Sequence, residues 1–75
     1  MNEQIDRFGE KLRTLRKQHK ITLKELARQT GYATHTPISD IETGKKRPSL
    51  EFAVRIASLF NISLDSLVDD DLELE

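Results

Sequence analysis

The stretch 21–50 constrains the fold of this chain more than any other part of it. It contains two short amphipathic segments joined by a turn that opens on Gly31, and glycine commonly ends a helix in the left-handed conformation. The second segment, 36–43, has only two inward apolar residues, Ile38 and Ile41. So short and polar a helix adds little to a core, and a DNA groove is the usual partner of this geometry.

A series of apolar, glycine and small polar residues runs through this stretch at fixed spacing. Its members are Ile21, Thr22, Leu26, Ala27, Gly31, Ile38, Ser39, Ile41, Glu42, Gly44, Pro48, Ser49 and Leu50. The series closely resembles the helix-turn-helix of the Xre family, which includes the phage lambda and 434 repressors and Cro. The resemblance covers residues 8–68. It implies an all-α, five-helix, lambda-repressor-like DNA-binding domain with the helix-turn-helix at its second and third helices.

Apolar spacing and capping residues predict where these helices lie. The expected ranges are 6–19, 22–30, 36–43, 50–60 and 63–68. The expected N-caps of the second, fourth and fifth helices are Thr22, Ser49 and Ser63. Glu25 should complete a capping box with Thr22, whereas either Thr34 or Thr36 caps the third helix. Pro37 is acceptable there because the first helical turn needs no N–H from it.

The 75 residues are enough for one small domain, 1–68, followed by an acidic tail, 69–75. Gly9 costs the first helix about 1 kcal/mol relative to alanine, but the family also places glycine there. We expect no strands. The expected core is Phe8, Leu12, Leu15, Leu26, Ala27, Ile38, Ile41, Leu50, Ala53, Ile56, Ala57, Phe60, Ile62 and Leu67.

Charge is divided unevenly along the chain, although its net value is only −1. Residues 1–47 hold eleven Lys and Arg against six Asp and Glu, a net of +5. Residues 48–75 hold one Arg against seven acidic residues, a net of −6. Because the local field decides whether phosphates are attracted, the basic half that contains the helix-turn-helix is the expected DNA-binding part.

Several functional classes are excluded by composition. The chain has no cysteine, and its two histidines lack paired ligand spacing, so we expect no metal and no cofactor. No apolar run approaches the length of a membrane span and the N-terminus is polar, so we expect a cytoplasmic protein without a membrane partner. Neither a catalytic triad spacing nor a phosphate-binding glycine loop is present, so we expect neither an enzyme nor a small-molecule substrate.

Positive side chains cluster around the helix-turn-helix and are expected to neutralise DNA phosphates. On the first helix, Arg13, Arg16, Lys17 and Lys20 follow helical spacing. The resemblance implies a different role for Arg16, an ion pair with Glu42 that orients the third helix. The remaining expected phosphate contacts are Arg13, Lys17, Lys20, Lys24, Arg28, Lys45, Lys46 and Arg47.

Base reading is expected at the start and outer face of the third helix. With Ile38 and Ile41 inward, the helical period turns the polar residues outward, and the resemblance places several of them at base-contacting positions. The expected base-reading residues are His35, Thr36, Ser39, Asp40 and Thr43. Asp40 can only accept a hydrogen bond, which suits cytosine N4. The alternative for Asp40 is a favourable charge near the helix N-terminus.

The sequence departs from the family pattern in three places. The turn after Gly31 is one residue longer than usual, and Leu23 replaces the common Gln at the start of the second helix. The recognition face also lacks Arg, Gln and Asn, which are the usual bidentate readers of bases. By default we expect Tyr32, in the turn, to pack in the core. The alternatives are that it contacts a DNA phosphate or a partner protein.

Two functional classes fit these observations. The first is a sequence-specific DNA-binding transcriptional regulator, a repressor, that binds double-stranded DNA with its third helix in the major groove. One module reads few base pairs, so we expect a homodimer, with the contact made by Leu64, Leu67, Val68 and Leu72, unless these residues instead close the core. The alternative is a non-catalytic protein-interaction module on the same fold, such as an antirepressor, an antitoxin-like protein or a bridging partner.

Overall fold

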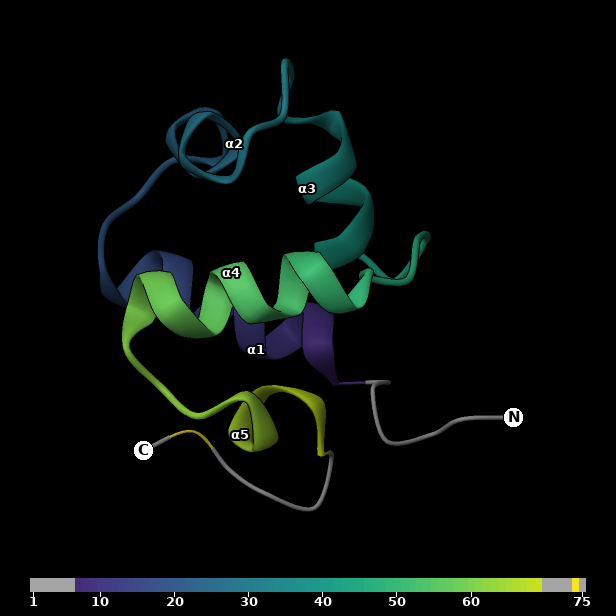
Figure 1. Cartoon of the computed structure of the whole chain (residues 1–75). Coiled ribbons are helices and arrows are strands. Elements are labelled where there is room, and N and C mark those ends of the chain that lie inside the picture. The colour runs from purple at the N-terminus through teal and green to yellow at the C-terminus, as the bar shows by residue number, and fades with distance from the viewer. Residues whose placement is uncertain (1–6, 70–73, 75) are drawn as a thin grey trace.

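The computed structural model describes residues 7–69 and 74. Residues 7–69 fold into five helices and contain no strand. In Figure 1 the helices surround one core, with α4 lying between α5 on one side and α2 and α3 on the other. The expected start of the first helix at Asp6 and most of the acidic tail lie outside the described residues. The helices are α1 (Phe8–Gln18), α2 (Leu23–Thr30), α3 (Thr36–Glu42), α4 (Leu50–Phe60) and α5 (Leu64–Val68).

Three helices begin at the hydroxyl caps that the sequence predicts. The side-chain oxygens of Thr22, Ser49 and Ser63 accept hydrogen bonds of 3.0, 3.0 and 3.1 Å from backbone N–H groups in the first turns of α2, α4 and α5. Such a bond satisfies a donor that has no partner within the helix. Gly31 ends α2 at φ +89°, in the left-handed region.

Two details of the predicted capping are wrong. The carboxylate of Glu25 accepts hydrogen bonds from Arg28 and Gln29 on α2 itself, so its role as a capping-box partner is replaced by side-chain pairing. Neither threonine caps α3, because His35 is the residue that precedes this helix and it makes no side-chain capping bond. Pro37 lies in the first turn of α3, as expected.

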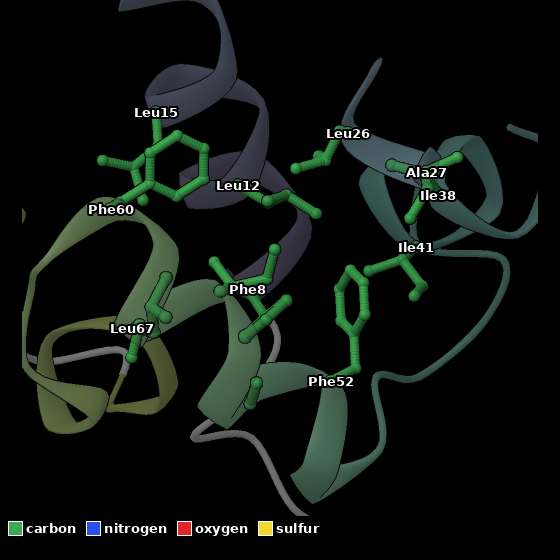
Figure 2. Packing of buried hydrophobic residues seen from close by; sticks show 13 residues of the cluster. Phe8, Leu12, Leu15, Leu26, Ala27, Ile38, Ile41, Phe52, Phe60 and Leu67 are labelled. Carbon is green, nitrogen blue, oxygen red and sulfur yellow. The ribbon is translucent and has the colours of Figure 1, made fainter. Parts of the chain in front are cut away.

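The core is a single cluster to which all five helices contribute (Figure 2). Its buried apolar side chains are Phe8, Leu12, Leu15, Leu26, Ala27, Ile38, Ile41, Phe52, Ala53, Ile56, Ala57, Phe60 and Leu67. Figure 2 shows Phe8 and Leu12 of α1 in the middle of these side chains. Most of this set was expected from helical spacing alone, and two expected members, Leu50 and Ile62, lie outside it.

Leu50 is the clearest error in the predicted core, because 72% of it is exposed. Phe52 is buried in its place, and its ring packs against Phe8 and Tyr32 at centroid distances of 6.2 and 5.8 Å. Phe52 therefore fills the space between α1 and the α2–α3 turn. Tyr32 packs against the core, which was the default expectation for this residue. Ile62 is only partly buried against the core.

Gly9 lets α1 and α3 approach each other closely. A Cβ at this position would lie 2.8 Å from the carbonyl oxygen of Glu42 and closer still to that of Ile41. Real Cβ atoms almost never come so near to backbone atoms, and these carbonyls belong to the end of α3 rather than to a flexible side chain. The glycine is therefore required by helix packing, which explains its presence within a helix.

Lys11 is a buried cation that sequence analysis did not single out. Only 2% of the residue is exposed, and its Nζ donates hydrogen bonds of 2.6 and 2.8 Å to the carbonyl oxygens of Ser66 and Asp69. Both carbonyls lie at the C-terminal end of α5, where helix carbonyls lack intrahelical donors and carry partial negative charge. Lys11 thus ties α1 to α5 across the core.

Candidate nucleic-acid interface

A largely buried ion pair fixes α3 against α1. The Arg16 Nε and Nη2 atoms donate to the two carboxylate oxygens of Glu42 at 2.7 and 3.2 Å. Arg16 Nη1 also donates to the carbonyl oxygen of Ile21 at 3.0 Å. The side chains are only 13% and 5% exposed. Because a two-bond arginine–carboxylate contact fixes orientation as well as distance, it sets the angle at which α3 is presented.

The outer side of α3 is polar and accessible. Ile38 and Ile41 are buried, whereas His35, Thr36 and Thr43 are exposed and Ser39 and Asp40 are partly exposed. The α3 residues predicted to read bases therefore lie opposite its buried side, with His35 just before the first turn. The hydroxyl of Thr43 donates to the carbonyl oxygens of residues 39 and 40, at 3.0 and 3.3 Å. It can accordingly offer a ligand only its lone pairs and its methyl group.

The basic loop after α3 is tied to the end of this helix. Gly44 takes φ +83°, which lets the chain reverse without the strain that a side chain would cause. The backbone N–H groups of Lys45 and Lys46 then donate to the Asp40 carbonyl oxygen, at 2.8 and 3.1 Å. This closure holds the exposed side chains of Lys45, Lys46 and Arg47 beside the C-terminal end of α3.

Exposed cations also lie on α1 and α2. Those predicted to contact phosphates there are Arg13, Lys17, Lys24 and Arg28, and all are exposed. Lys20, expected on the first helix, is also exposed but lies after the end of α1, in the turn before α2, at φ +58°. Arg28 differs from the others because it is paired with Glu25, with nitrogen–oxygen distances of 2.6 and 3.1 Å. The side-chain hydrogen bond from Arg28, and then that from Gln29, holds the pKa of Glu25 below its ordinary value. Part of the Arg28 charge is therefore compensated within α2.

This geometry corresponds to that of known DNA-binding proteins. The helix-turn-helix family model matches residues 12–67, more than half of the chain. The chain belongs to the helix-turn-helix family. It is 38% identical over 66 residues to the uncharacterised HTH-type transcriptional regulator YobD of Bacillus subtilis (strain 168), an alignment that covers 84% of this chain and 58% of YobD. The chain thus spans little more than half of that relative.

Solved structures of helix-turn-helix domains share the fold. The N-terminal DNA-binding domain of SinR from Bacillus subtilis superposes with a TM-score of 0.78 at 28% identity, covering 91% of this chain and 99% of that one. The P22 c2 repressor, crystallised with a synthetic operator, gives a TM-score of 0.74 at 28% identity, covering 81% of this chain and 91% of that one. The Xre-like, lambda-repressor-like fold expected from the sequence is confirmed.

Residues 7–69 and 74 contain no group of three or more His, Cys, Asp or Glu side chains that could hold a metal ion. No helix among them is long and apolar enough to cross a membrane.

Sequence reasoning missed two features of this helix-turn-helix domain. One is the Glu25–Arg28 pair, which i, i+3 spacing could have indicated and which reduces the positive charge available on α2. The other is Lys11, which is three residues after Phe8 and four before Leu15, on the apolar stripe of α1. A lysine at such a position requires a buried acceptor, and this signal was available.

Proposed function

We propose that this chain is a sequence-specific transcriptional regulator, a repressor, that inserts α3 into the major groove of double-stranded DNA. The observation that carries the proposal is the placement of α3: its inner side is held by the buried Arg16–Glu42 pair, while its outer side is polar and open. The likeness to the P22 c2 repressor, which was crystallised with a synthetic operator, supports the binding of DNA by this chain.

In this proposal the exposed residues divide into two groups. Phosphate contacts supply affinity and register, whereas contacts to base edges supply sequence preference. The proposed phosphate contacts are Arg13, Lys17, Lys20, Lys24, Arg28, Lys45, Lys46 and Arg47, and the proposed base contacts are His35, Thr36, Ser39, Asp40 and Thr43. DNA sites selected from a random library would show whether the protein has a preferred sequence and whether that sequence is palindromic, as binding of a dimer requires.

Replacing Lys17 by alanine is expected to weaken binding to every DNA sequence by a similar factor. Lys17 is exposed on α1, and a lost phosphate contact lowers the slope of log affinity against log salt by about one unit. The measurement is affinity for several duplexes across a salt series. Gln18→Ala, an exposed and uncharged neighbour, is the control and should leave the slope unchanged. An unaltered slope in Lys17→Ala would remove this residue from the phosphate contacts.

Replacing Asp40 by asparagine is expected to change which base is preferred at one position of each half-site. A carboxylate can only accept from cytosine N4, whereas an amide both donates and accepts and so suits adenine. Discrimination at that position should change by about 1–3 kcal/mol. The test measures affinities for all single-base variants of a selected site. If Asp40→Asn instead scales every affinity by one factor, as expected for Lys17→Ala, then Asp40 does not read a base.

The protein-interaction module remains a second candidate because of Leu23. This residue packs partly against the core, and, unlike the glutamine that is common in the family pattern, it cannot form a hydrogen bond with DNA. If the chain shows no salt-dependent affinity for any DNA in a random library, this second candidate replaces the repressor.

A further inference from the structure

The loop between α3 and α4 presents an exposed serine shortly after three cations. Lys45, Lys46 and Arg47 precede Ser49 by four, three and two residues, and Pro48 lies between. The three cations and Ser49 are all exposed, and the backbone at Ser49 is extended, with φ −77° and ψ 161°. An exposed serine in an extended, basic segment is complementary to an enzyme whose substrate groove is acidic.

The Ser49 hydroxyl also caps α4. Its oxygen accepts a hydrogen bond of 3.0 Å from the Phe52 N–H, at the helix end where backbone N–H groups lack intrahelical acceptors and carry partial positive charge. A phosphate on this oxygen could accept hydrogen bonds from the same N–H groups, and the helix dipole favours its negative charge. Phosphorylation is therefore compatible with the folded state of α4.

A polar cavity beside Ser49 offers room for a phosphoryl group. Arg55 supplies a guanidinium to its lining, and Tyr32 supplies a hydroxyl that can donate a hydrogen bond. The carboxylate in the lining, that of Glu51, already lies 3.1 Å from Arg55 Nη2, and a guanidinium has further N–H donors for a second anion. The cavity measures about 200 Å³ and is lined by Thr30, Tyr32, Ser49, Glu51, Phe52 and Arg55.

We propose that Ser49 is phosphorylated by a serine/threonine protein kinase and that the phosphate weakens DNA binding by the basic loop 45–47. The Ser49 oxygen forms a bond to the γ-phosphorus of ATP, the bond from that phosphorus to the bridging oxygen breaks, and ADP leaves with its electron pair. The hydroxyl proton passes to the catalytic base of the kinase. The effect on DNA binding rests on the proposed function, whereas the modification itself does not.

The added charge is close enough to act on the basic loop. An extended chain advances at most about 3.6 Å per residue, so the backbone of Ser49 lies within about 7 Å of that of Arg47 and about 11 Å of that of Lys46. Salt screens charges over about 8 Å at physiological ionic strength. A phosphoserine adds about −1.5 to −2 charges at pH 7, which offsets more than half of the charge of the three cations.

Ser63 provides a matched control within the same chain. It is also an exposed N-cap, and its oxygen accepts a hydrogen bond of 3.1 Å from the Ser66 N–H at the start of α5. The four residues before it, 59–62, contain no lysine or arginine. The two serines therefore share a capping role and differ in the charge of the segment that precedes them.

The first test incubates the folded chain with ATP and a serine/threonine kinase that selects lysine or arginine two to four residues before its target. Mass spectrometry should find the phosphate on Ser49 and not on Ser63, and Ser49→Ala should remove it. Because the helix cap is retained, thermal unfolding of the phosphorylated chain should occur at no lower temperature than that of the unmodified chain. The proposal is overturned if Ser49 stays unmodified, if Ser63 is modified equally, or if phosphorylation lowers the unfolding temperature.

The second test measures affinity for DNA sites selected from a random library. At about 0.1 M salt the phosphorylated chain should bind at least about 10-fold more weakly, and the slope of log affinity against log salt should be shallower by about one to two units. Ser49→Asp keeps a capping oxygen and adds one negative charge, so it should bind about 3-fold more weakly. Ser63→Asp should bind as the wild-type chain does.

The outcomes separate the two proposals. Equal effects of Ser49→Asp and Ser63→Asp on DNA affinity would overturn the regulatory role of Ser49, because a charge anywhere on the chain would then act alike. If the unmodified chain binds no DNA, the proposed function fails instead, and the kinase experiment still decides whether Ser49 is a modification site.

Discussion

Replacing Glu42 by glutamine is expected to lower the free energy of unfolding by about 3–5 kcal/mol, the usual loss when one partner of a buried ion pair is removed. The change keeps the shape of the side chain but leaves the Arg16 guanidinium, 13% exposed, without a compensating charge. A domain of this size is stable by only about 4–11 kcal/mol. The variant should therefore be close to unfolding at physiological temperature.

Urea denaturation followed by circular dichroism measures this effect. The matched control is Glu25→Gln, which removes the carboxylate of an exposed pair with Arg28 on α2 and should lower the free energy of unfolding far less, because water screens an exposed pair. In both variants the helical signal should be lost above the midpoint of urea unfolding. If the two substitutions lower the free energy of unfolding by the same amount, the Arg16–Glu42 pair does not stabilise the contact between α1 and α3. DNA binding should also weaken in Glu42→Gln, because this pair orients α3.

Replacing Gly9 by alanine is the second substitution with a large expected effect. Within a helix this change ordinarily stabilises a protein by about 1 kcal/mol. Here the new Cβ would meet the carbonyl oxygens of Ile41 and Glu42, and the two helices would have to move apart. We expect a net loss of about 1–2 kcal/mol, since overpacking against backbone atoms, at about 2–3 kcal/mol, outweighs the gain in helix propensity.

The control for this prediction is Gly44→Ala. That position has no atoms within 4 Å of an added Cβ, but its φ is +83°, so its cost is limited to backbone strain of about 1 kcal/mol. Thermal unfolding of both variants separates a packing cost from a conformational one. A Gly9→Ala protein that is as stable as the wild type would mean that α1 and α3 separate at no cost.

Local signals were sufficient to predict the helices. Thr22, Ser49 and Ser63 are strong N-caps, and Gly31 is a strong stop signal, because each acts through atoms within a few residues in the sequence. The Arg16–Glu42 contact came instead from the family resemblance. No local rule joins residues 26 positions apart.

The choice between Leu50 and Phe52 shows where local signals fail. Helical spacing around Ala53, Ile56 and Ala57 admits either residue at the edge of the buried side of α4. The decision depends on the partners across the core, since Phe8 and Tyr32 leave a space that an aromatic ring fills. These partners come from α1 and from the turn after α2. Periodicity within α4 contains no information about them.

The roles of the site residues are less predictable than their exposure. Helical period places Thr36 and Asp40 outward without reference to any other element. Which bases they contact depends on the docking angle of α3 and on the DNA, and neither is encoded in spacing. Arg28 also shows that a cation counted toward DNA binding can be held by an acidic neighbour, Glu25, on its own helix.

The buried ammonium of Lys11 has a consequence for the smallest unit that can fold. It donates to the carbonyl oxygens of Ser66 and Asp69, which a shortened chain ending after α4 would lack. Such a chain would retain the whole helix-turn-helix, but it would lose Leu67 from the core and both of these hydrogen bonds of Lys11. A chain shortened in this way, for example to graft the helix-turn-helix onto another scaffold, therefore requires a second change. Lys11 should be replaced by an apolar residue of similar length.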